Sequence, residues 1–268
     1  MKVALCLSGL IRDFERSGYS YNEYLCKDLD CDIFIHTWKD NVETDNTRFA
    51  TSKMGNCKNK KQFFQSIFPD SNINLLLEDF GSDWNFNKHK QNDISPRTTA
   101  IMYYSVYKAN LLKKEFESSN GFLYDVVIRA RMDFLLKETI SEYELRDVII
   151  NNKTVYVGTN LHHKGRSSER MNWSYSGRYG VEDQLAFGSS KAMDKYSDCY
   201  LDRVGMQSIG GEIILGEQFQ QYDLQPKRTA YQFLMLQHYD ENESTYWEDY
   251  DEYVQRKFIR SDHIEETK

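Results

Sequence analysis

The fold is decided first by Val3-Ala4-Leu5-Cys6-Leu7, an apolar run that ends at once in Ser8-Gly9. A continuous apolar run of this length is typical of a strand buried on both faces, as in a parallel sheet. A second run follows at Asp32-Ile33-Phe34-Ile35-His36, and residues 19–27 between the two suit a helix. Strand, helix and strand in this order predict an α/β fold with a mostly parallel central sheet flanked by helices.

The rest of the chain continues this pattern of strands and helices. Apolar runs predict further strands at residues 73–77, 124–131, 155–158 and 184–187. A long helix is predicted from Ser95-Pro96, as cap and first turn, to Asn120-Gly121, because one apolar stripe has the helical period. That stripe consists of Met102, Val106, Ala109, Leu112 and Phe116. Residues 190–200 and 212–222 are also expected to be helical.

The chain shows no internal repeat and contains only three prolines. No segment therefore has the composition expected of a linker between two domains. We expect one domain at residues 1–238, followed by an acidic, aromatic segment at residues 239–268. Residues 40–62 and 159–180 lack periodicity and are predicted to be long surface loops. The second loop is rich in basic and aromatic side chains, so we expect it to help close a binding site.

The bulk composition excludes several classes of function. A net charge of −7 disfavours a nucleic-acid-binding surface. No apolar run approaches the ~20 residues of a transmembrane segment, and the first apolar run is too short for a signal peptide. The five cysteines have no metal-site spacing, so we expect free thiols and a cytoplasmic location, which would be the host cytoplasm for a viral protein. They are Cys6, Cys26, Cys31, Cys57 and Cys199.

The segment Val127-Ile128-Arg129-Ala130-Arg131-Met132-Asp133 carries the clearest chemical signal. Alternation along a strand places Arg129, Arg131 and, if the strand continues, Asp133 on one face. Charged side chains at the end of a buried strand cost free energy unless an opposite charge or a hydrogen-bond partner compensates them. Ligands of open α/β sheets bind at the edge formed by the carboxyl ends of the strands. Guanidinium groups bind diphosphates, and an aspartate can hold a divalent metal that bridges the same phosphates. The alternative is an arginine–aspartate salt bridge that needs no ligand.

Four segments in order resemble a group of bacterial and large-virus glycosyltransferase-like proteins. They are residues 3–9 with Arg12, residues 32–38, residues 129–133, and residues 182–188 followed by Met193 and Glu212. The resemblance spans about residues 1–225. It implies a GT-A fold that uses a nucleotide-diphosphate sugar donor and a glycan or other hydroxyl acceptor, often with Mn²⁺ or Mg²⁺.

The resemblance also implies roles for individual residues. Asp183, and after it Glu182, would be the base that deprotonates the acceptor hydroxyl, although a helix cap or a surface pair would explain both acids equally well. Asp133 lies where GT-A enzymes carry the metal-binding DxD motif. Arg131 replaces the first aspartate of that motif, so either a metal on Asp133 or the two arginines would neutralise the leaving diphosphate.

The turn after the first strand is the last candidate part of the donor site. Gly9 allows a ligand to approach the backbone closely, and Ser8 and Arg12 lie beside it. The alternative is an ordinary tight turn with a surface arginine. Two other functions remain open: a nucleotidyltransferase that makes nucleotide-sugars, and a non-catalytic nucleotide- or carbohydrate-binding module with the same fold.

Overall fold

The computed structural model describes nine stretches of the chain. They are residues 1–11, 14–39, 59–79, 94–136, 138–160, 174–175, 178–179, 181–203 and 211–235. Arg12, Cys57, the 239–268 segment and most of the two expected loops at 40–62 and 159–180 lie outside them. Within these stretches no helix combines the length and the apolar character needed to cross a membrane.

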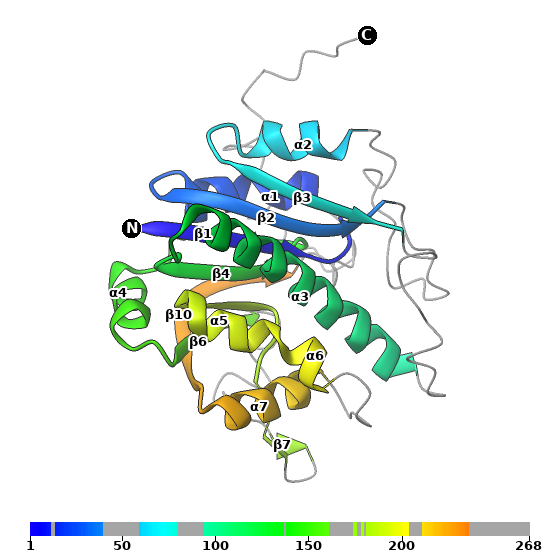
Figure 1. The fold of residues 1–268 in the computed structure, drawn as a ribbon, viewed down its shortest axis with the longest axis vertical. Helices are drawn as coiled ribbons and strands as arrows, with labels where there is room; N and C mark the ends of the chain where they lie inside the picture. Colours follow the sequence, from blue (N-terminus) through cyan, green and yellow to red (C-terminus); the bar gives the residue numbers. More distant parts are fainter. Residues whose placement is uncertain are drawn as a thin grey trace, which may run out of the picture.

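The described strands form one eight-stranded, mostly parallel sheet and one separate pair (Figure 1). The sheet contains β1 (Lys2–Ser8), β2 (Asp30–Trp38), β3 (Ile73–Glu78), β4 (Val126–Arg131), β5 (Phe134–Leu136), β6 (Thr154–Asn160), β9 (Leu185–Gly188) and β10 (Gln225–Met235). The strands are arranged in the order β3-β2-β1-β4-β9-β6-β10-β5. Strands β9 and β5 run antiparallel to their neighbours, and the other neighbouring pairs are parallel. The separate pair is β7 (Ser174–Tyr175) with β8 (Arg178–Tyr179).

Helices cover both faces of the sheet, so the fold has three layers (Figure 1). In the described chain they are α1 (Phe14–Tyr21), the π-helical turn η1 (Asn22–Cys26), α2 (Lys60–Ile67), α3 (Ile94–Asn120), α4 (Glu142–Ile150), α5 (Ser190–Ser197), α6 (Cys199–Arg203) and α7 (Gly211–Tyr222). Helices α1, α2 and α4 pack on one face. Helices α3, α5, α6 and α7 pack on the other.

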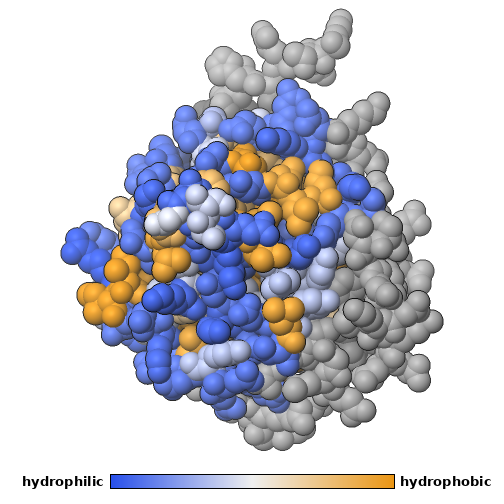
Figure 2. All heavy atoms as spheres, in the orientation of Figure 1, coloured by the Kyte–Doolittle hydropathy of each residue, from blue (hydrophilic) through white to orange (hydrophobic). Residues whose placement is uncertain are grey.

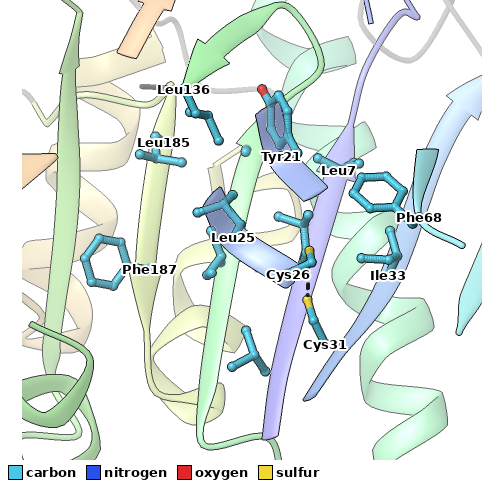
Figure 3. Close-up of a cluster of buried hydrophobic side chains, with 14 of the residues drawn as sticks. Leu7, Tyr21, Leu25, Cys26, Cys31, Ile33, Phe68, Leu136, Leu185 and Phe187 are labelled. Atoms are coloured by element: carbon cyan, nitrogen blue, oxygen red, sulfur yellow. Dashed lines mark hydrogen bonds between the residues drawn. The ribbon is translucent and has the colours of Figure 1, made fainter. Parts of the chain in front are cut away.

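Strand β1 lies inside the sheet and is buried on both faces. Val3, Leu5 and Leu7 join the core beneath α1 and α2, part of which is shown in Figure 3. Ala4 and Cys6 join the core beneath α3. The expected α/β fold with a mostly parallel central sheet is therefore confirmed. The first apolar run is continuous because both faces of β1 are buried, as expected.

Most of the predicted strands and helices are present. The structure differs from the prediction in where some of them begin or end and in containing additional strands and helices. The first predicted helix begins earlier, at Phe14, and ends in η1. Helix α3 begins at Ile94, one residue before the expected cap position at Ser95. Helix α2 begins at Lys60, within the expected loop, because the Asn59 side chain accepts a hydrogen bond from the Gln62 N–H. Strands β5 and β10 and helix α4 were not predicted.

The outer surface on the α3 side is mainly hydrophilic (Figure 2). Apolar areas on it are separate from one another, and one of them lies over α4, on the left in this view. There Tyr143, Ile149 and Ile150 are exposed. The described cysteines, in contrast, are buried free thiols, as expected: Cys6, Cys26, Cys31 and Cys199.

A buried ammonium group links α3 to α5. Lys113 Nζ lies 2.9 Å from Glu117 Oε2 and 2.8 Å from Asp194 Oδ1, and it donates a hydrogen bond to Ser190 Oγ at 2.6 Å. All three ammonium donors therefore have a partner, which is what a fully buried lysine requires.

We predict that Lys113→Met destabilises the fold by about 3 kcal/mol, because it leaves the Glu117 and Asp194 carboxylates without their counter-charge. Urea denaturation would measure the loss. The control is Lys114→Met on the same helix, since Lys114 Nζ is half-exposed and lies 4.0 Å from Asp198. The control should cost less than about 1 kcal/mol. Equal, small losses in both variants would show that the buried network contributes little.

Candidate active site

The charged end of β4 lies on the face of the sheet that α3 and α5 cover. Val127 packs in the core on that face, whereas Val126, Ile128 and Ala130 pack in the opposite core. The alternation expected from the sequence is therefore confirmed. Arg129 follows Val127 on the same face and is only 2% exposed, so a guanidinium group is buried next to the sheet.

Arg131 and Asp133 form a bidentate ion pair at the end of β4. Arg131 Nε donates to Asp133 Oδ1 at 2.9 Å, and Nη2 donates to Oδ2 at 2.8 Å. Burial disfavours the charge on Arg131, but the Asp133 carboxylate outweighs it and raises the pKa of the guanidinium above its ordinary value. The salt bridge left open by the sequence is thus present.

Helix α1 holds the turn that carries Asp133. Ser17 Oγ donates to the Met132 carbonyl at 2.9 Å, and the Tyr21 hydroxyl donates to the Arg131 carbonyl. Ser20 Oγ accepts a hydrogen bond from the Leu136 N–H at 3.1 Å. Burial, together with the negative charge of Asp133, raises the pKa of the Tyr21 hydroxyl, which therefore remains a donor. These bonds fix the backbone on both sides of Asp133.

The direction of β9 brings Glu182 and Asp183 to the carboxyl end of β4. Strand β9 pairs antiparallel with β4, and Leu185 lies opposite Ala130, so the residues before β9 reach the carboxyl end of β4. The first turn of α7 joins them, because the Val181 N–H donates to the Glu212 carbonyl at 2.9 Å. A Cβ atom on Gly211 would lie 2.8 Å from Asp183 Oδ2, so a larger residue here would displace the Asp183 carboxylate.

Burial and the neighbouring acidic groups raise the pKa values of Glu182 and Glu212. Burial raises the pKa of Glu182 to about 7, and the charges of Asp183 and Glu212 add to the effect. Burial and the charge of Asp183 also raise the pKa of Glu212, whereas Arg131 opposes this shift. Arg228 of β10 opposes the shift of Glu182. Acids and arginines from β4, β10, α7 and the segment before β9 thus share one electrostatic environment.

Three side chains of β1, β4 and the segment before β9 have buried polar atoms without a hydrogen-bond partner in the described part of the chain. They are Ser8 Oγ, Nε and Nη1 of Arg129, and Gln184 Oε1, and each side chain is more than nine-tenths buried. Ser8 is the sheet neighbour of Arg131 on β1. Unsatisfied buried polar groups are rare in native structures, and a missing ligand is one physical reason for them.

Gly9 forms the turn after β1. It has a φ of 111°, and its N–H donates to the His36 carbonyl at 3.1 Å. Among the described residues, its chain neighbours aside, no atom lies within 4 Å of a Cβ built on it. Because a left-handed φ strains other residues, glycine is required here. Ser8 lies beside Arg131 in the sheet, and its role in donor binding stays a prediction. Arg12 lies outside the described residues, and its role stays a prediction.

The residues around Asp133 do not fit a metal site. Both of its carboxylate oxygens accept hydrogen bonds from Arg131. Across the described stretches, no three His, Cys, Asp or Glu side chains are grouped so that they could hold a metal ion. Binding of Mn²⁺ or Mg²⁺ by Asp133 therefore stays a prediction that this geometry does not support.

Four residues of the site had no role assigned from the sequence: Gln184, Gly211, Glu212 and Arg228. The motif that resembles the glycosyltransferase-like proteins includes Glu212. The motif did not indicate that Glu212 lies close to Glu182 and Asp183. Gly211 and Arg228 carry no local signal, because their importance arises only from the contact with Asp183 and the proximity to Glu182.

The chain was also compared with known proteins. No protein-family model matches it, and no curated protein matches it. The resemblance described above therefore depends on the motifs of this sequence alone.

The raised pKa of Glu182 predicts a pH-dependent stability. Its folded pKa of about 7 exceeds the ordinary value of 4.5, so the folded state favours the protonated form. This contribution to stability is complete at low pH and is lost as the pH rises from about 4.5 to about 7. Glu182→Gln removes that loss. Its melting temperature relative to wild type should therefore increase by about 2–4 °C from pH 5 to pH 8.

Calorimetry at several pH values would measure this difference, with Glu115→Gln on the exposed face of α3 as the control. A difference that stays constant or decreases with pH would contradict the assigned environment of Glu182.

Proposed function

We propose that the protein is a glycosyltransferase of the GT-A type, which transfers a sugar from a nucleotide-diphosphate sugar to a glycan or another hydroxyl acceptor. The observation that carries the proposal is the pair of guanidinium groups, Arg129 and Arg131, at the carboxyl end of β4. Ligands of open α/β sheets bind at this edge. The parallel order β3-β2-β1-β4 agrees with a nucleotide-binding fold of this type.

Arg129, Arg131 and Ser8 would bind the diphosphate of the donor. Nε and Nη1 of Arg129 and Oγ of Ser8 are buried polar atoms that a phosphate oxygen would satisfy. Guanidinium groups also stabilise the negative charge that develops on a leaving diphosphate. Burial strengthens this effect, because electrostatic interactions are stronger where water is excluded.

Glu182 and Asp183 would serve the acceptor. The resemblance names Asp183 first as the base, but Asp183 is buried against the start of α7, whereas Glu182 is partly exposed. A base works best when its pKa lies near the operating pH, and the pKa of Glu182 is raised to about 7. We therefore assign proton abstraction to Glu182, with Asp183 as the neighbouring charge that raises its pKa.

One observation favours a second candidate function. The closed ion pair between Arg131 and Asp133 satisfies both groups without a ligand. A non-catalytic module that binds a nucleotide or a carbohydrate through Arg129 would need nothing more. Hydrolysis separates the two candidates, because a transferase slowly releases free sugar from its donor and a binding module does not.

A thermal-shift screen of nucleotide-sugars and nucleoside diphosphates, with and without Mn²⁺, tests donor binding. A true donor at 100 times its Kd should add about 2.7 kcal/mol to the stability. The same donor should release free sugar during prolonged incubation. If no nucleotide-sugar changes the melting temperature and none is hydrolysed, the proposed function is wrong.

A pair of variants tests the acceptor side. Glu182→Gln should lower turnover by about 10²–10⁴ while donor affinity changes less than about threefold, because the base acts only on the acceptor. In the wild type, kcat should rise as the pH increases through about 7, and Asp183→Asn should move this step to lower pH. The exposed Glu142→Gln on α4 is the control. Loss of donor binding in Glu182→Gln would contradict the assigned role.

A further inference from the structure

The two members of the Arg131–Asp133 pair differ in their access to solvent. The Asp133 side chain is 2% exposed, whereas the Arg131 side chain is 21% exposed. A ligand that approaches from solvent therefore meets the Arg131 side chain before that of Asp133. By the resemblance, Arg131 stands where the DxD motif of GT-A enzymes has its first carboxylate.

A divalent cation would have to compete with Arg131 for Asp133. Both carboxylate oxygens already accept hydrogen bonds from Nε and Nη2 of Arg131. A metal ion would either displace the guanidinium group, leaving it partly buried without its partner, or bind beside its positive charge. Both arrangements cost free energy.

The guanidinium group is also held in place by its surroundings. It lies 5.6 Å from the centre of the Phe134 ring, on the turn that Ser17 and Tyr21 of α1 fix through backbone carbonyls. A charge that is already fixed needs no reorganisation when negative charge develops on a substrate. This is the arrangement expected of a group that acts on a transition state.

We propose that the guanidinium group of Arg131, positioned by Asp133, replaces the divalent metal as the charge that stabilises the leaving nucleoside diphosphate. This inference rests on the proposed function. In the transfer, the bond between the anomeric carbon and the diphosphate oxygen breaks, and its electron pair stays on the diphosphate. The acceptor oxygen bonds to the anomeric carbon, and its proton goes to the base. Asp133 is a positioning residue and binds no metal.

Calorimetric titration with ADP, CDP, GDP, UDP and inorganic pyrophosphate tests this inference on the wild-type protein, once in EDTA and once in Mn²⁺. The affinity of the diphosphate that binds best should agree within about threefold between the two conditions. This comparison needs no variant, so it is independent of any effect of a substitution on folding.

Variants of Arg131 identify the group responsible. Arg131→Gln should weaken diphosphate binding in EDTA by about 10- to 100-fold, the usual effect of losing a hydrogen bond to a charged group. Arg131→Lys should weaken it less, because the charge remains but the fork geometry is lost. The matched control is Arg146→Gln, which breaks the exposed ion pair of Arg146 with Glu142 on α4. This control should leave the affinity unchanged.

A double-mutant cycle tests whether Asp133 acts through Arg131. Asp133→Asn should weaken diphosphate binding, and Arg131→Gln combined with Asp133→Asn should weaken it no further than Arg131→Gln alone. Losses that simply add would show that Asp133 affects binding independently of Arg131 and would contradict its positioning role. Circular dichroism spectra would confirm that the variants are folded.

Two other outcomes overturn the inference and differ in what they say about function. If Mn²⁺ strengthens diphosphate binding by tenfold or more and Asp133→Asn abolishes that gain, Asp133 is a metal ligand, and the glycosyltransferase proposal still stands. If no diphosphate binds in either condition, both the inference and the donor site of the proposed function are wrong.

Discussion

Two guanidinium groups at the carboxyl end of β4, that of Arg129 buried and that of Arg131 partly buried, are the constraint on which the arrangement of this site depends. A buried cation needs a nearby anion and hydrogen-bond acceptors, or it destabilises the fold. Asp133 meets this need for Arg131 by a bidentate pair, and α1 holds the backbone that carries Asp133. Arg129 has no such carboxylate pair among the described contacts, and two of its nitrogen atoms lack acceptors. The same strand thus carries one satisfied cation and one that suits an anionic ligand.

Three acidic residues, Glu182, Asp183 and Glu212, share the electrostatic environment of these guanidinium groups. Burial, together with the negative charge of Asp183, raises the pKa values of Glu182 and Glu212. Arg131 and Arg228 oppose these shifts. The charges of the site are therefore interdependent, and a substitution at one of them changes the protonation of others. Gly211 adds a steric constraint, because a Cβ atom at this position would displace the Asp183 carboxylate.

Strand direction explains how these groups come together. A parallel β9 would bring the residues that follow it to the carboxyl end of β4. Because β9 is antiparallel, the residues that precede it, Glu182 and Asp183, arrive there instead. The polypeptide then returns through α5 and α6 to the first turn of α7, which adds Glu212. The site is therefore built where the otherwise parallel order of the sheet is interrupted.

The sequence by itself determined the layers of the fold and the alternation of side chains along β4. Apolar runs at β1 and β2 require burial on both faces, and the stripe on α3 has one helical period, so these elements depend on local patterns. Alternation also determined which face Arg129 takes. Only the tertiary structure decided that Arg131 pairs with Asp133, and that Gly211, Glu212 and Arg228 join Glu182. The reason is physical: pairing, burial and pKa shifts depend on distances between residues far apart in the chain, and strand direction, which sets those distances here, leaves no mark on a local pattern.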